Sequence, residues 1–131
     1  MNLKNIILEF DNQKTKIINL WLNDIHFKEI IKKHDLDSEI IKKRYSFAVW
    51  DYYVNCVNEK NQAGLSTLVI DFIKFLKKHE LKSNELFKVY AAFKNAIIEF
   101  SFTHNYQELQ VIKDINDYFE NMFSEILNVY A

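Results

Sequence analysis

The sequence has no proline and only one glycine, Gly64, among its 131 residues. These two residue types supply most of the turns that a β-rich fold needs, so a sheet protein is excluded. Apolar residues instead recur at spacings of three and four, which is the period of an amphipathic helix. We therefore predict an all-α fold. Glycine-rich phosphate loops need at least two glycines, so they are excluded as well.

The sequence also has only one cysteine, almost no net charge and no long apolar run. The single Cys56 cannot form an internal disulfide, and the opening stretch MNLKNIILEF places Glu9 where a signal peptide would continue its apolar run. No run approaches the roughly 18 apolar residues of a membrane span. The net charge is -1, which creates no field to attract nucleic acid or anionic lipid. These absences predict a cytoplasmic protein with no nucleic-acid partner and no membrane span.

Aromatic residues, by contrast, make up 15% of the chain, so we expect a core built on large rings. A chain of this length forms one domain and buries roughly two thirds of its unfolded surface. We predict a single domain, residues 1–131, of five or six helices in a globin-like or bundle-like arrangement. The expected helices cover residues 3–22 with an interruption near Asp11 and Asn12, then 25–33, 38–60, 66–79, 83–102 and 106–130.

Polar caps mark the helix ends in place of glycine and proline. Short side chains at four places are expected to accept hydrogen bonds from first-turn N–H groups, namely the pair Asn23-Asp24, Asp37, Ser66 and Ser83. Asn105 followed by Glu108 has the form of a capping box for the last helix. Gly64 is expected to end the aromatic helix 38–60, because glycine adopts the left-handed conformation of a helix end without strain.

The histidines lack the spacing of metal ligands. A di-iron bundle needs Glu-x-x-His pairs on two helices, and the sequence has none, so we expect no metal and no cofactor. His34, His79 and His104 stand near expected helix ends, where an imidazolium suits the helix dipole. A haem needs only one axial histidine in a dry pocket. A haem or small apolar-ligand binding protein therefore stays an alternative.

Other reactive groups have plain interpretations. Cys56 lies on the apolar stripe of helix 38–60, where a buried thiol acts as a small hydrophobic group with a raised pKa. No catalytic motif is present, so we predict that the protein is not an enzyme. Basic clusters at Lys32-Lys33, Lys42-Lys43-Arg44 and Lys77-Lys78 are interpreted as solvated surface, because nucleic-acid binding would require that they converge on one side.

Aromatic side chains on two helices exceed what one stripe can bury. Helix 38–60 carries them all round, so it either lies at the centre of the fold or presents a second face to a partner. The last helix has the same excess. Six aromatic residues are candidates for a pocket or an interface, with core packing as their plainer interpretation: Trp21, Trp50, Tyr53, Phe93, Tyr118 and Phe123. Self-association through such faces would make the protein a homodimer.

An ordered pattern of features covers most of residues 15–131. It includes Gly64, Phe72 followed by FLKKHEL, ELF at 85–87, and FKNAIIEF at 93–100. Upstream are LWLNDIHFKEIIKKHDLDSE and AVWDYYVNCV, and downstream is IKDINDYFENMFSEILNVY. This pattern resembles a helical N-terminal module found ahead of PAS, GGDEF or histidine-kinase parts in bacterial signalling proteins. That module is in turn similar to the non-haem globin-like N-terminal domain of the stressosome RsbR proteins.

The resemblance implies signal input and dimerisation without catalysis. Leu65-Ser66-Thr67 follow the glycine, where the family often has a small polar residue, Cys and Pro, so thiol-based sensing is not carried over. We expect a non-catalytic sensory or regulatory interaction domain of bacterial signal transduction. It would form a homodimer and relay changes in helix packing through its C-terminal helix to a downstream signalling domain or protein. A stand-alone inhibitor or immunity-type protein-binding module is a further alternative.

Overall fold

The protein is described by a computed structural model that covers residues 2–59 and 64–131. Its elements are α1 (Leu3–Asp11), α2 (Lys14–Leu22), α3 (Ile25–Lys33), α4 (Ser38–Ile40), the π-helical turn η1 (Ile41–Tyr45), α5 (Ser46–Asn58), α6 (Thr67–Lys78), α7 (Ser83–Thr103) and α8 (Leu109–Tyr130). These two described ranges contain no strand, which confirms the all-α prediction.

The number of helices differs from the expectation. The predicted helix 3–22 is broken between α1 and α2 at Asn12 and Gln13, close to the anticipated interruption. Because α4, η1 and α5 continue as one helix, the described residues form seven helices, not five or six. The break lets both short helices bury their apolar sides, which a single straight helix could do only along one stripe.

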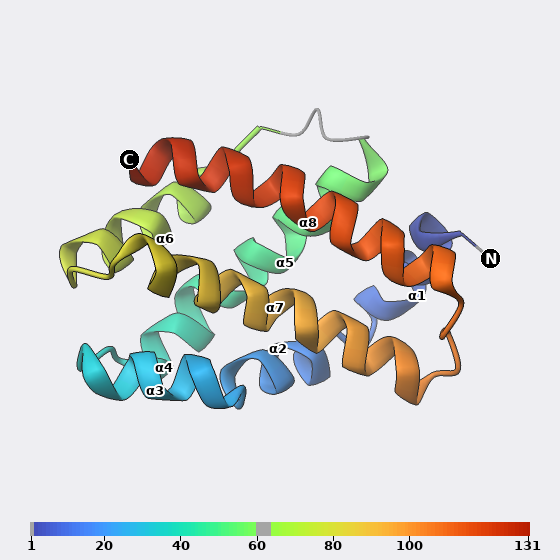
Figure 1. Ribbon diagram of the computed structural model, residues 1–131, viewed down its shortest axis with the longest axis horizontal. Coiled ribbons are helices and arrows are strands. Elements are labelled where there is room, and N and C mark those ends of the chain that lie inside the picture. Colours follow the sequence, from blue (N-terminus) through green and yellow to red (C-terminus); the bar gives the residue numbers. More distant parts are fainter. Residues whose placement is uncertain (1, 60–63) are drawn as a thin grey trace.

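Helix α5 lies at the centre of the arrangement. It contacts α1, α2, α6 and α8, while α7 contacts α2, α3 and α8. Figure 1 shows α7 and α8 running antiparallel along one side of the molecule, with α5 behind them. Phe47 is the only aromatic residue of α5 that is largely exposed, so its aromatic excess reflects a central position. None of the described helices has the length and apolar character needed to cross a membrane.

Three of the expected N-caps are confirmed by their hydrogen bonds. A carboxylate oxygen of Asp24 accepts from the N–H of Phe27 at 3.1 Å, and one of Asp37 accepts from the N–H of Glu39 at 3.0 Å. Ser66 caps α6 through its hydroxyl oxygen. Each cap satisfies a first-turn donor that has no partner inside its helix.

The expected cap at Ser83 is wrong. Ser83 is already helical, and the N-cap of α7 is Lys82. The N–H of Lys82 donates to Oε1 of Glu85 at 2.9 Å, so the carboxylate three residues into the helix reaches back over the helix start. An ionised carboxylate is also favoured by the positive end of the helix dipole.

Helices α3, α6 and α7 share one kind of C-terminus. Each ends at a histidine, His34, His79 or His104, as predicted. The residue after each histidine has a positive φ, which is 51° at Asp35, 63° at Glu80 and 65° at Asn105. The following N–H then bonds to a carbonyl five residues back, as between Leu36 and Ile31 at 2.9 Å. This is the Schellman closure, with acidic or amide residues where glycine is usual.

Two predictions about helix ends are wrong. Asn105 does not form a capping box with Glu108, because its left-handed backbone ends α7, and α8 begins at Leu109 instead of residue 106. Gly64 has no positive φ, so its conformational freedom is not used to end a helix. Helix α5 ends at Asn58, and residue 60 of the predicted helix 38–60 lies outside the described residues.

Candidate functional site

Four of the six aromatic candidates meet in the core. Phe93 of α7 lies at the centre, and its ring centroid is 5.4 Å from that of Trp21, 6.4 Å from that of Trp50 and 5.8 Å from that of Tyr53. All three pairs have the T-shaped geometry that aromatic quadrupoles favour. None of the four side chains is accessible to solvent. We call these four residues the Phe93 cluster.

The polar atoms of the Phe93 cluster have partners within the protein. Nε1 of Trp21 donates to the carbonyl of Val89 at 2.8 Å. Nε1 of Trp50 donates to a carboxylate oxygen of Asp11 at 2.7 Å, and the Tyr53 hydroxyl donates to the carbonyl of Ile115 at 3.1 Å. Since these groups are buried and satisfied, they tie helices together. The geometry supports core packing for these four positions.

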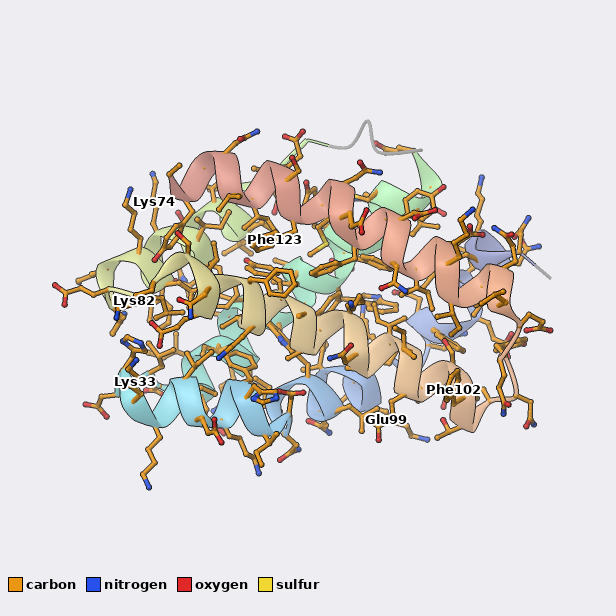
Figure 2. All side chains as sticks on the ribbon, in the orientation of Figure 1. Lys33, Lys74, Lys82, Glu99, Phe102 and Phe123 are labelled. Atoms are coloured by element: carbon orange, nitrogen blue, oxygen red, sulfur yellow. The ribbon has the colours of Figure 1, made fainter. Side chains whose placement is uncertain are left out.

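Phe123 belongs to a second aromatic group, which reaches the surface. Its ring centroid is 5.4 Å from that of Phe87 and 6.0 Å from that of Phe119. Phe87 is 46% exposed and Phe123 is partly buried. Figure 2 shows Phe123 between α7 and α8, on the side of the molecule where these two helices are uncovered. Phe119 is buried at 3% exposure, and Nζ of Lys94 lies 5.1 Å from its ring centroid, so the exposed part of this group is Phe87 and one side of Phe123.

Further apolar residues extend this surface along both helices. They follow helical spacing from Phe87 on α7 and from Phe123 on α8. We define the α7–α8 face as Phe87, Ala91, Ile98, Ile112, Phe119, Phe123 and Leu127. Leu127 is exposed, whereas Ala91, Ile98 and Ile112 are partly buried against the core.

Charged residues border the α7–α8 face on its two outer edges. Lys88 and Glu99 stand on the α7 edge, and Lys113 and Glu120 stand on the α8 edge. Each follows a residue of the face by one position, which turns it about 100° away from the seam between the helices. All four are exposed, and none forms an ion pair within the described part of the chain.

Tyr118 lies away from Phe123, on another side of α8. It lines a hollow of about 260 Å³ together with Leu3, Asn58 and Asp114. The Oδ1 atom of Asn58 is buried and has no hydrogen-bond partner among the residues that the structure describes. The structure thus divides the six candidates among a core cluster, a surface face and this hollow.

A buried charge network is the feature that sequence reasoning missed. Glu85 is only 5% exposed, and its Oε2 accepts from Nζ of Lys33 at 3.1 Å and lies 2.9 Å from Nε2 of His34. Burial alone would raise the pKa of Glu85, but the hydrogen bonds from Lys82, His34 and Lys33 outweigh it and lower that pKa to about 2. The sequence feature that could have indicated this network is a glutamate, Glu85, in the first turn of the expected helix 83–102.

The remaining reactive groups are held in unreactive forms. Burial raises the pKa of the Cys56 thiol, as predicted, and also raises the pKa of Tyr52 and that of Tyr90. A thiol attacks as its thiolate, so Cys56 is not activated for nucleophilic chemistry. The described residues contain no cluster of three His, Cys, Asp or Glu side chains suited to a metal ion.

Comparisons of the chain with protein-family models, curated proteins and solved structures find no match. The family resemblance, which covers most of residues 15–131, therefore stays an expectation. Among the described surfaces, the α7–α8 face is the strongest candidate for a functional surface.

Proposed function

We propose that this chain is a non-catalytic regulatory interaction domain that pairs with a second copy through the α7–α8 face. The observation that carries the proposal is a partly exposed aromatic group, centred on Phe87 and Phe123, with charges of both signs on each of its two edges. Exposed apolar patches bordered by polar residues are typical of protein interaction sites. The resemblance to dimeric, globin-like input domains of bacterial signalling proteins points the same way.

Twofold symmetry explains the order of the charges. If the axis runs parallel to α7 and α8, it places α7 of one copy antiparallel on α8 of the other. Phe87 and Phe123 lie side by side within one chain. Phe87 of each copy therefore faces Phe123 of the other copy across the interface. In this register Lys88 lies near the Glu120 of the second copy, and Glu99 lies near its Lys113. An isologous contact repeats each pair twice, which makes the face self-complementary.

We propose that the C-terminal helix relays changes in packing, and its contacts support this role. Helix α8 contacts α1, α5, α6 and α7. The carbonyl of Ile115 accepts the Tyr53 hydroxyl of α5, and near the other end the Tyr130 hydroxyl donates to the carbonyl of Leu81 at the α6–α7 corner. A shift at either contact moves α8 relative to the core, so α8 would pass a signal from inside the domain to the dimer interface.

The proposal is tested by measuring the mass of the protein in solution. We expect sedimentation equilibrium to give a dimer for the parent chain, and we expect Phe87→Ser to weaken dimerisation by about ten-fold or more, because a central aromatic anchor is lost from both copies. Phe47→Ser is the matched control, since Phe47 is 47% exposed on α5 and lies outside the face. Phe47→Ser is expected to leave dimerisation unchanged.

Two results would count against this function. A parent chain that stays monomeric at high micromolar concentration would remove the second copy as the partner. Equal weakening by Phe87→Ser and Phe47→Ser would place the interface elsewhere. Circular dichroism of both variants checks that the helices are intact.

A further inference from the structure

A hollow of about 320 Å³ lies between α2, α3 and the start of the α4–η1–α5 helix. Its volume is in the range of small-molecule sites. Lys28 and Lys32 reach it from α3, and Lys42 reaches it from η1. Three lysines from two elements that are apart in the sequence therefore line one hollow.

The three lysines have no ionic partners in the described part of the chain. None of them has a carboxylate oxygen within 4.0 Å in residues 2–59 and 64–131. Glu39 is the one acidic residue that lines the hollow, and its Oε2 lies 3.6 Å from Nζ of Lys43. The lining thus carries three ammonium groups against one carboxylate.

This charge arrangement is not explained by helix formation alone. Lys32 stands in the last turn of α3, where the helix dipole favours a cation. Lys28 precedes that turn, and like charges four residues apart in a helix repel each other slightly. Lys42 belongs to the π-helical turn, a widened geometry that is frequent at functional sites. One of the three lysines therefore comes from an irregular part of the backbone, and the other two come from the regular helix α3.

The rest of the lining suits the organic part of a ligand. Leu22 and Ile31 contribute apolar surface, and Asn19 and Ser38 contribute polar groups that can hydrogen-bond to hydroxyls or rings. Binding sites for small molecules commonly combine an apolar lining with a few converging polar groups.

We infer that this hollow binds a small phosphorylated metabolite. Lysine recognises phosphate as a point charge, and a phosphate monoester carries about −1.5 to −2 charge at neutral pH, which the excess of lysines over Glu39 balances. The phosphoryl group lies among Lys28, Lys32 and Lys42, and the organic part covers Leu22 and Ile31. This binding goes beyond the proposed function and does not require a dimer.

The test is an NMR titration of the whole chain with two probes at constant ionic strength. Inorganic pyrophosphate reports on the charge alone, and AMP adds an organic part. We expect saturable shifts of the amide signals of residues 19–42 at millimolar concentrations or below for both probes, with AMP binding more tightly. The double variant Lys32→Gln/Lys42→Gln should weaken binding by about ten-fold or more, because two charged hydrogen-bond donors are removed.

Lys74→Gln/Lys78→Gln is the matched control, because it removes the same charge from an exposed lysine pair on α6. Lys74 projects outward from that helix (Figure 2). This control should change the affinity less than about two-fold. Equal loss in both double variants, or no saturable shift at about 10 millimolar probe, would overturn the inference. Binding to phosphatidylserine vesicles without binding to either probe would overturn it as well, since the ligand would then be a membrane surface.

Discussion

Aromatic residues play opposite parts in the Phe93 cluster and on the α7–α8 face. The four rings of the cluster are buried, and each of their polar atoms has a partner in another helix or in the facing backbone. On the α7–α8 face, Phe87 leaves nearly half of its surface in water. Both groups have centroid distances of ordinary aromatic pairs. Their difference lies in what covers them, so ring packing alone does not separate a core from an interface.

The largest expected effect is on the free energy of unfolding, and it would separate Phe93 of the cluster from Phe87 of the α7–α8 face. We expect Phe93→Ala to lower the free energy of unfolding by about 3 to 5 kcal/mol, because it removes a buried ring that three others contact. Phe87→Ala should cost less than about 1 kcal/mol for a monomer, since half of that ring is already hydrated. Urea denaturation at low protein concentration measures both. Equal losses would mean that Phe87 is a core residue.

A smaller effect is expected at Glu85, a buried residue held by charge instead of by ring packing. Its folded-state pKa of about 2 lies below the ordinary value of 4.5, so its stabilisation is complete above pH 4.5 and is lost as the pH falls toward 2. We expect Glu85→Gln to cost roughly 2 kcal/mol at neutral pH and to flatten the loss of stability between these pH values. Denaturation at pH 7, 4.5 and 3 tests this.

Glu125→Gln is the control for that experiment, because Glu125 is exposed, forms no ion pair within the described residues and lies outside the α7–α8 face and its charged edges. It should leave the pH dependence of stability unchanged. A Glu85→Gln protein that loses stability with falling pH as steeply as the parent would show that the network does not hold the carboxylate ionised.

The smallest effect concerns the corner that leads into α7 and so positions the face. Glu80 has a φ of 63°, a conformation that is strained for residues with a side chain. Glu80→Gly should raise the free energy of unfolding by about 0.5 to 1 kcal/mol, net of the greater freedom of glycine in the unfolded chain. Asn105→Gly should gain less, because asparagine tolerates the left-handed region better. Thermal denaturation of both variants would show the order, and a destabilised Glu80→Gly protein would contradict it.

Local chemistry made part of the fold predictable. The caps at Asp24, Asp37 and Ser66 were found because each side chain acts on its own first turn. The error at Ser83 arose because two neighbouring residues compete to cap α7, and the network around Glu85, which involves a residue 51 positions away, favours the carboxylate. Left-handed Asn105 was missed because asparagine suits both a helix start and a helix end.

The candidate site was less predictable than the helices. Phe93 and Phe123 look alike in the sequence, since both occur at helical spacing among apolar neighbours. Likewise, Lys32 precedes another lysine and Lys78 follows one, each near a helix end. The sequence does not indicate that Lys32 lines a hollow together with Lys28 and Lys42. Helical periodicity indicates that one side of a helix is apolar, but it does not indicate which other helix will cover that side.

The sequence by itself determined that the chain is helical and where most helices begin and end, because these depend on spacing, caps and the scarcity of glycine and proline. Only the tertiary structure decided which aromatic rings are covered, which carboxylate is buried and which lysines meet. Those outcomes depend on contacts between residues far apart in the chain, and such contacts are set by how the helices pack, not by the order of residues within any one helix.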